Sequence, residues 1–414
     1  MLKKNTIIII LSILYILHTM PFLGFRYPPA LYAILIIALF FIFISTEGLK
    51  SVLKILPIFL IPLLDVFIST KTTLSFFQGI SGFLQDLILP LLAIYIIRRN
   101  DVKTGKILLL IYIGINFITC ITTYWGNLMF PGASRELATG GFSNTTMYLV
   151  YSNLNIGGFS FCYTIVLYAI FLIGTIKNRE YIKVRHWFFV FVIIYLIAIC
   201  MVVLVTEYTT ALLMLVAVLL LFFIKRNFKL KYIIALGCFA LISFYVFKPL
   251  IVDVLHVASE NIQSDSVSHR LYDLSLSLDG KLTTEGSDLD TREEGYTKSL
   301  KTFIKTPFGT WNFNNIGGHS YFFDALSKYG IFGLILLIIT IAKLYSIYMK
   351  PLNGHFIYGY TFVALLLFVA MGFVNPHLFT DVIMFVVPVY SFVLKSTTFN
   401  NTQNHKHQSR LINI

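Results

Sequence analysis

The stretch Gly317–Ile338, GGHSYFFDALSKYGIFGLILLI, places a histidine, a hydroxyl and a carboxylate directly before a long apolar run. His319 is the side chain best suited to proton transfer near neutral pH. Arg270 and Arg292 precede it, and arginine suits phosphate because its planar guanidinium stays charged and donates paired hydrogen bonds. These residue types predict a site for a phosphate- or diphosphate-bearing substrate.

Each of these residues also has a simpler structural interpretation. A loop arginine is often no more than a solvated charge. His319 or Ser320 could cap a helix that begins near Ser320, and Asp324 in its first turn would favour the positive end of the helix dipole. Gly330 and Gly333 could serve only to permit close helix packing. Spacing alone leaves these alternatives open.

The rest of the chain is apolar enough to place this segment at a membrane. Hydrophobic residues make up 57% of the 414 residues and charged residues only 12%, about half the share in a soluble chain. A helix needs about 20 mainly apolar residues to cross hydrocarbon. We therefore predict an all-α polytopic membrane protein with about twelve transmembrane helices, near residues 6–22, 30–46, 53–70, 79–97, 106–125, 156–176, 187–205, 208–224, 232–248, 329–348, 356–375 and 380–395.

The basic residues set the expected orientation. Of the 32 Lys and Arg residues, 21 lie in alternate short linkers and at the termini, and 4 lie in the intervening linkers. Cytoplasmic linkers are the basic ones, so both termini are predicted to be cytoplasmic. The same topology explains the net charge of +13, and no nucleic-acid partner is expected.

The prediction divides the chain into four parts: helices 1–9 (1–248), an extracytoplasmic loop (249–328), helices 10–12 (329–395) and a cytoplasmic tail (396–414). Residues 249–318 of the loop hold 10 of the 19 acidic residues, and the length of the loop favours a functional role over a simple connection. Its residues 293–309, EEGYTKSLKTFIKTPFG, predict a helix that stops at a Pro-Gly turn. The four cysteines lie in apolar runs and indicate neither disulfides nor a metal site.

The segment Arg292–Leu337 resembles the signature of the O-antigen ligase and polymerase superfamily of bacterial membrane proteins. In that family an arginine opens a helix, a proline–glycine turn follows, and a His-Ser or His-Asn pair, a leucine and two spaced glycines lead into a membrane helix. The matching residues here are Arg292, Pro307, Gly309, His319, Ser320, Leu326, Gly330 and Gly333. The remaining chain is similar to the family only in architecture.

The resemblance implies a polysaccharide polymerase at the outer face of the bacterial cytoplasmic membrane. Such an enzyme moves a glycan from a polyprenyl diphosphate carrier onto another lipid-linked repeat unit. Arg270 and Arg292 would hold the leaving diphosphate, and His319 would deprotonate or orient the acceptor hydroxyl. No metal ion or other cofactor is expected, because arginines can neutralise the diphosphate.

Further candidates would contact the substrate. Asp324 could set the tautomer of His319 or bind sugar hydroxyls, and aromatic residues near Trp311 could stack on sugar rings. The predicted substrate-binding set is Asp324, Ser320, Trp311, Arg135 and Asp86.

Two features of the chain leave these assignments open. Many family members carry a T-x-S-R run where this chain has VTEYTTALL (205–213), with Glu207 and Tyr208 in place of Ser and Arg. Arg135 could supply the missing charge from another loop. Asp65 and Asp86 lie within predicted spans, where a carboxylate lines a cavity or pairs with a neighbouring helix.

Three other functions remain as alternatives. A ligase of the same family would hand the finished glycan to a different acceptor, and sequence separates ligase from polymerase poorly. A flippase or transporter for lipid-linked oligosaccharide suits twelve spans, but transporters concentrate charges at the membrane midplane. A sensor would need a cytoplasmic signalling module, which the sequence does not resemble. The partners expected of a polymerase are its lipid-linked substrate, a chain-length regulator and a flippase.

Overall fold

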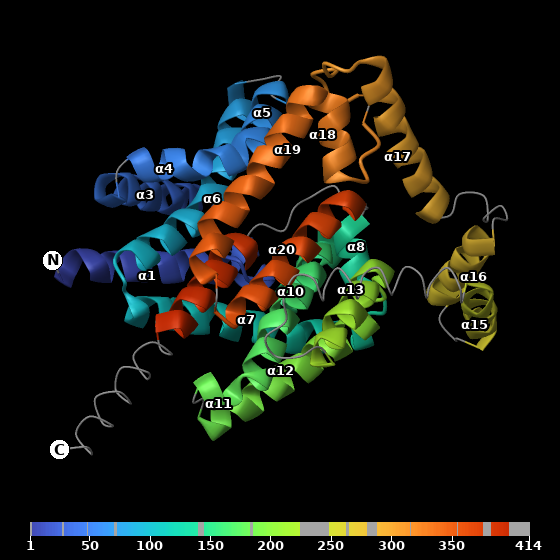
Figure 1. The fold of residues 1–414 in the computed structure, drawn as a ribbon, viewed down its shortest axis with the longest axis horizontal. Helices are drawn as coiled ribbons and strands as arrows, with labels where there is room; N and C mark the ends of the chain where they lie inside the picture. The colour runs from blue at the N-terminus through green and yellow to red at the C-terminus, as the bar shows by residue number, and fades with distance from the viewer. Residues whose placement is uncertain are drawn as a thin grey trace. The chain divides into compact units, whose positions relative to one another are not determined.

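The computed structural model of the chain describes residues 2–26, 29–47, 49–69, 73–139, 145–182, 185–223, 248–261, 265–279, 288–314, 316–353, 355–375 and 382–396 (Figure 1). Within these ranges all regular secondary structure is helical, and no strand occurs. The all-α prediction is confirmed for this part of the chain.

Helices long and apolar enough to cross a membrane make up much of the fold. Within the described ranges seven segments meet this condition: Leu49–Ile68, Gly79–Arg98, Val102–Met129, Phe159–Lys177, His186–Val205, Ile331–Leu352 and Ile357–Val374. Shorter apolar helices coincide with four further predicted spans: Thr6–His18, Leu31–Glu47, Thr209–Phe222 and Val382–Ser396. The ninth predicted span, near 232–248, lies outside the described residues apart from Lys248. The number of twelve spans therefore stays a prediction.

The chain divides into two compact units. The first comprises Met1–Arg226, Ile339–Phe368 and Phe379–Ile414, and the second comprises Asn227–Ile338 and Val369–Leu378. The second unit contains the predicted extracytoplasmic loop together with the first turns of one membrane helix and the last turns of another.

The first unit contains most of the apolar helices. In chain order they are α1 (Leu2–His18), α2 (Pro21–Arg26), α3 (Pro29–Glu47), α4 (Leu49–Ile55), η1 (Leu56–Phe59), α5 (Leu60–Ser69), α6 (Thr73–Arg98), α7 (Val102–Met129), α8 (Ala133–Thr139), α9 (Thr145–Asn153), α10 (Phe159–Lys177), α11 (Arg179–Ile182), α12 (His186–Val205), α13 (Thr209–Leu219) and η2 (Leu220–Phe222). The later part of α19 (Ile331–Leu344), η3 (Tyr345–Met349), η4 (Lys350–Leu352), the earlier part of α20 (Ile357–Val374) and η5 (Val382–Val386), which continues as helix to Ser396, also belong to it.

Helix α10 forms the centre of this unit. Over the 18-residue apolar stretch of α10, 72% of the residues are buried. The corresponding share is 33% in α12, which packs against α10. Tyr163 and Tyr168 of α10 are fully buried. A polar contact also lies in this core, because Asn116 Nδ2 donates to the Tyr112 carbonyl at 2.8 Å and to Tyr168 Oη at 3.4 Å. Hydrophobic side chains exposed on α12, such as Leu204, are what a lipid-facing helix requires.

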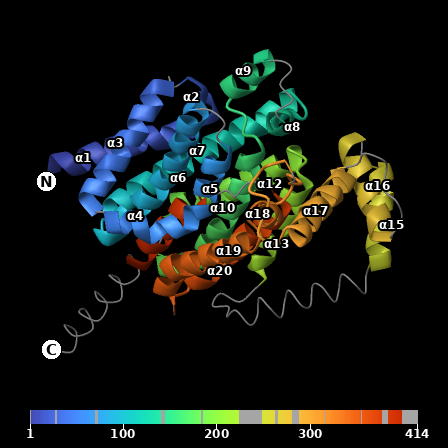
Figure 2. The ribbon, with the colours of Figure 1, turned by 90° about the horizontal axis from the view of Figure 1, so that it is seen from above.

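The second unit is built from helices of mixed polarity. α15 (Lys248–Asn261) and α16 (Asp265–Asp279) pack side by side (Figures 1 and 2). α17 (Asp288–Lys305) packs against α18 (Tyr321–Tyr329), and the chain then enters α19. The helix predicted over 293–309 is confirmed as part of α17, which ends at Lys305 just before the turn at Pro307 and Gly309.

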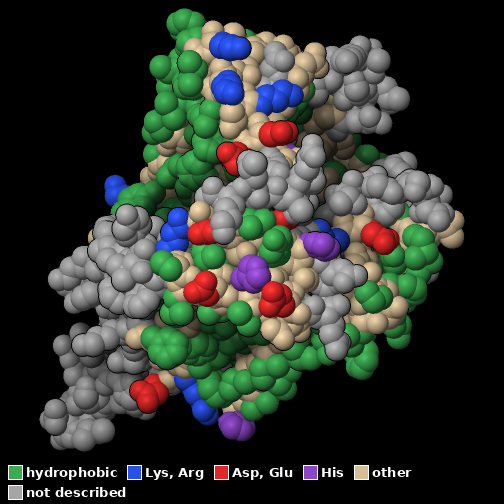
Figure 3. Space-filling model, turned by 90° about the vertical axis from the view of Figure 1, so that its right-hand side faces the viewer, with side chains coloured by type: hydrophobic (Ala, Val, Ile, Leu, Met, Phe, Trp, Pro, Cys, Tyr) green, Lys and Arg blue, Asp and Glu red, His purple; other side chains and the backbone are tan. Residues whose placement is uncertain are grey.

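Charge is distributed unevenly along α17. Acidic residues such as Glu293 lie in its earlier turns and Lys298, Lys301 and Lys305 in its later turns. This order is favourable for the helix dipole, whose positive end is at the N-terminus. At the top of the molecular face drawn in Figure 3, basic side chains (blue) form a group with acidic ones (red) just below it, whereas the two kinds are mixed over the rest of the face.

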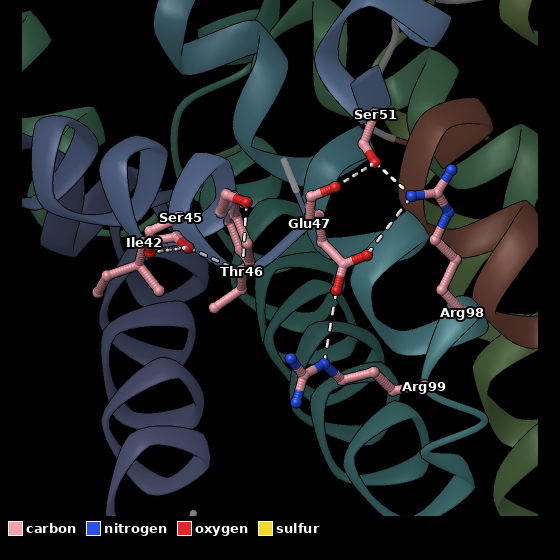
Figure 4. Close-up of polar contacts among 8 residues, drawn as sticks. Ile42, Ser45, Thr46, Glu47, Ser51, Arg98 and Arg99 are labelled. Carbon is pink, nitrogen blue, oxygen red and sulfur yellow. Dashed lines mark hydrogen bonds and ion pairs between the residues drawn. The ribbon is translucent and has the colours of Figure 1, made fainter. Parts of the chain in front are cut away.

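A shared carboxylate joins the end of α3 to the end of α6 (Figure 4). Glu47 Oε2 lies 3.6 Å from Arg98 Nη1, and Glu47 Oε1 accepts from Arg99 Nε at 3.4 Å. Arg98 also donates to Ser51 Oγ, which in turn donates to the Glu47 carbonyl at 3.0 Å. The Glu47 side chain is 9% exposed, so the carboxylate is largely buried between the two half-exposed guanidinium groups.

We expect Glu47→Gln to lower the free energy of unfolding by about 1 kcal/mol, because both arginines lose their counter-charge while remaining partly solvated. Thermal unfolding in detergent measures the change. Glu180→Gln, at an exposed position on α11, is the matched control and should leave stability unchanged. Equal unfolding temperatures for Glu47→Gln and wild type would show that the cluster contributes nothing.

Candidate functional site

Ser320 begins α18 and also ties it to α20. Its backbone is extended, with φ −145° and ψ 119°, and its Oγ accepts from the Phe323 amide at 3.2 Å. The predicted N-cap is therefore confirmed. The same hydroxyl donates to the Gly372 carbonyl at 3.2 Å, so in this structure its hydrogen bonds serve the fold.

Arg292 is bound to the C-terminal end of α20. Its Nη1 donates to the Val374 carbonyl at 3.0 Å, and the neighbouring Asn375 carbonyl accepts from the Tyr321 amide at 2.8 Å. The last carbonyls of a helix lack intrahelical partners and carry partial negative charge, which attracts a cation. The bond uses one N–H of a guanidinium that has several. Arg292 therefore keeps donors for an anion while it is held in place.

His319 lies against α17 through a glycine contact. A Cβ added at Gly295 would lie 2.4 Å from His319 Cδ2, and one added at Gly317 would lie 2.0 Å from the Gly295 carbonyl oxygen. Only glycines allow this approach of loop and helix. Gly295 is three residues after Arg292, and residues so spaced on a helix lie about 5–6 Å apart on one side. Helix α17 thus brings Arg292 and His319 to the same region, both half-buried.

Asp324 fastens the loop that carries His319. It is buried, and its Oδ1 accepts from Ser299 Oγ at 2.7 Å and from the Gly318 amide at 3.3 Å. Ser299 Oγ also accepts from the Gly317 amide at 2.8 Å. The predicted place of Asp324 in the first turn of α18 is confirmed. These bonds make it a positioning residue for His319, acting through the loop backbone.

Trp311 offers an exposed aromatic surface on the same unit. It is 46% exposed and has φ +53°, and its Nε1 donates to the Phe308 carbonyl at 3.0 Å. Its ring centroid lies 5.4 Å from that of Tyr329. A ring held at its edge, with part of its surface in solvent, can stack on a sugar.

The glycines of the sequence signature meet in one backbone contact. A Cβ at Gly330, where φ is +61°, would lie 2.1 Å from the Pro307 carbonyl oxygen. A Cβ at Gly309, where φ is +88°, would lie 2.4 Å from the Lys328 carbonyl oxygen. The Ile331 amide donates to the Pro307 carbonyl at 2.8 Å. Pro307, Gly309 and Gly330 therefore fix the turn after α17 to the start of α19, which confirms the packing interpretation for Gly330.

The other predicted residues lie elsewhere. Arg270 is on α16, in the second unit, but its side chain lies outside what the structure describes. Asp86 on α6 is exposed and Asp65 on α5 is half-buried, and these two helices pack against each other in the first unit. Among the described residues, no group of three or more His, Cys, Asp or Glu side chains is placed to hold a metal ion.

Arg135 lies in the first unit beside the segment that departs from the family pattern. It follows Ser134 on α8, and the Ser134 carbonyl accepts from Tyr208 Oη at 2.6 Å. Tyr208 follows Glu207, which has φ +56°, a conformation that costs a non-glycine residue energy and is more frequent at functional sites. The hydrogen bond thus joins the two segments that carry Arg135 and Glu207.

Sequence reasoning missed three residues of the site in the second unit. Gly295 had a recognisable signal, since a glycine inside a helical pattern often marks close packing. Ser299 and Asn375 had none, because their partners are distant in the chain and only the fold brings them together.

Comparison with known proteins adds no relative. No protein-family model matches the chain, and no curated protein or solved structure matches it. The function of the chain must therefore be argued from the residues of Arg292–Leu337 and their geometry.

We expect Gly295→Ala to displace His319, because the new methyl group would overlap its ring and approach the Gly317 carbonyl. The free energy of unfolding should fall by about 1–3 kcal/mol, measured by thermal unfolding in detergent. Gly114→Ala in α7 is the matched control, since a Cβ there meets nothing within 4 Å. If both variants behave alike, the contact between Gly295 and His319 is absent in solution.

For Asp324→Ala we expect a loss of about 1–3 kcal/mol of unfolding free energy, because the Ser299 hydroxyl and the Gly318 amide lose a buried acceptor. Ser299→Ala should cost less, and the double variant should cost less than the sum of the two changes, since the residues share one network. Glu294→Ala, an exposed acidic residue on α17, is the control. Strict additivity would contradict the shared network.

Proposed function

We propose that this chain is a membrane-embedded glycosyltransferase of the O-antigen polymerase type. It transfers a glycan from polyprenyl diphosphate onto another lipid-linked repeat unit, at the outer face of the bacterial cytoplasmic membrane. The proposal includes twelve spans, cytoplasmic termini and an extracytoplasmic loop that carries the site. The resemblance of Arg292–Leu337 to that superfamily supports it.

The observation that carries the proposal is that Arg292 lies on α17 and that His319, in the loop before α18, lies against the same helix. An anion-binding group and a proton-transfer group lie about one helical turn apart through Gly295. A glycosyl diphosphate needs both within the reach of one sugar–phosphate linkage. Asp324, Ser299 and the glycines hold the loop that carries His319, and the Val374 carbonyl holds Arg292, as the rigid support of a catalytic group requires.

The chemistry assigns a step to each group. The acceptor hydroxyl attacks the anomeric carbon of the donor glycan, and the bond from that carbon to the diphosphate oxygen breaks. His319 takes the proton of the hydroxyl. Arg292 stabilises the negative charge that builds on the leaving polyprenyl diphosphate. Arg270 is proposed as a second cation for the same diphosphate, and Trp311 as a stacking surface for sugar.

The start of α19 fits the apolar part of such a substrate. Directly after the site residues, four large hydrophobic side chains are between 41% and 49% exposed: Ile331, Phe332, Leu334 and Ile335. An isoprenoid chain buries apolar surface of this kind as its polar head reaches the loop. Further partners proposed for the chain are a flippase that delivers the substrate and a chain-length regulator.

We expect His319→Ala and Arg292→Ala each to lower the polymerisation rate by about 10²-fold or more, through loss of proton transfer and of charge stabilisation. The measurement is glycan length in cells that express each variant in a deletion background, with membrane levels confirmed. Single repeat units in place of a ladder are the expected result. Lys301→Ala removes an exposed cation from the same helix and should leave the ladder unchanged.

Two other results would redirect the proposal. Complete chains that stay unattached to their final acceptor would favour a ligase. Wild-type ladders from both variants would rule out the site, and a flippase or transporter would then become the better explanation of the apolar helices.

A further inference from the structure

Asn375 is an anomaly at the centre of the site. Its side chain is fully buried, and among the described residues neither Oδ1 nor Nδ2 has a hydrogen-bond partner. The other buried side-chain atoms without a partner in the described part are single hydroxyl oxygens, of Ser12 and Tyr195. An amide is the more costly group to leave unpaired, because it can donate and accept several bonds. Such a group calls for an explanation.

The backbone hydrogen bonds of Asn375 do not explain why this position carries an asparagine. The backbone N–H of Asn375 donates to the Met371 carbonyl at 2.9 Å, and the backbone carbonyl of Asn375 accepts from the Tyr321 N–H at 2.8 Å. Both are backbone bonds that any residue other than proline would make. A leucine of similar size would make them too, without burying an unpaired polar group. An asparagine here therefore lowers stability compared with an apolar residue.

The neighbours of Asn375 are the site residues. In the preceding turn Val374 accepts from Arg292 and Gly372 accepts from Ser320. Asn375 itself holds Tyr321, two residues after His319. The unpaired amide thus lies where the segments carrying the proposed cation and the proposed base meet.

Its chemistry complements that of Arg292. A phosphate only accepts hydrogen bonds and suits a guanidinium. An amide both donates and accepts, which matches a group that does the same, such as a sugar hydroxyl or a sugar amide. We infer that Asn375 binds a hydroxyl or amide group of the donor glycan beside the diphosphate held by Arg292. This inference rests on the proposed function and assigns the sugar-binding part of that site.

Binding requires the contacts at this helix end to open, since Asn375 is fully buried. The bond from Arg292 to Val374 is suited to this. A guanidinium gains when it exchanges a neutral carbonyl for a phosphate, because the phosphate carries a full negative charge and can accept two parallel hydrogen bonds from it. The diphosphate would therefore bind as the α20 end is released, and the sugar would follow.

The test compares two probes on the purified full chain in detergent: polyprenyl diphosphate alone and polyprenyl diphosphate that carries a saccharide. We expect Asn375→Leu to bind the first probe as wild type does and the second at least tenfold more weakly. Its unfolding temperature should equal or exceed that of wild type. Arg292→Ala should weaken the binding of both probes. Tyr195→Phe removes a different buried polar group that has no partner among the described residues, the Tyr195 hydroxyl, and should leave the binding of both probes unchanged.

The outcomes separate this inference from the proposed function. If Asn375→Leu binds both probes as wild type does while Arg292→Ala binds neither, the inference is wrong and the diphosphate site stands. A lower unfolding temperature for Asn375→Leu would also overturn it, because the amide would then have a structural partner. If wild type binds neither probe, the proposed function itself fails.

Discussion

The end of α20 is the constraint on which the site depends. A helix leaves its last carbonyls without intrahelical partners, and in a largely apolar protein these must be satisfied by other segments. Here the guanidinium of Arg292, the hydroxyl of Ser320 and the amide of Tyr321 satisfy them. The interaction that ends the helix thus also fixes the arginine and the N-terminus of α18, which brings groups from distant parts of the sequence together.

The glycines give the sequence signature a physical explanation. Gly330 is pressed against Pro307 and Gly309 against Lys328, at distances where any side chain would collide. The proline–glycine turn and the later glycine therefore belong to one backbone contact, and the contact forms only when both are present. Gly295 and Gly317 make a second such contact, which places His319. The glycines of the sequence pattern are therefore explained by close backbone contacts, and these contacts in turn position the residues that could do chemistry.

Local features of this unit could be predicted from sequence, and long-range ones could not. The Ser320 cap, the place of Asp324 and the end of α17 before Pro307 follow from rules that act within a few residues. The bond between Asp324 and Ser299 joins residues 25 positions apart, and no pattern in the chain indicates it. Asn375 ends an apolar run and resembles an ordinary helix end until its missing partners are seen.

The polar groups of the site differ in how far their hydrogen bonds are used. Asp324, Ser299 and Ser320 are engaged with one another, with backbone groups or with both, so they have little left for a ligand and serve to hold the frame. Arg292 uses one donor, and the Asn375 side chain uses none within the described chain. Unused hydrogen-bonding capacity is costly in a buried place unless something binds there. The distribution of that capacity therefore separates the groups that build the site from those that we propose to bind the substrate.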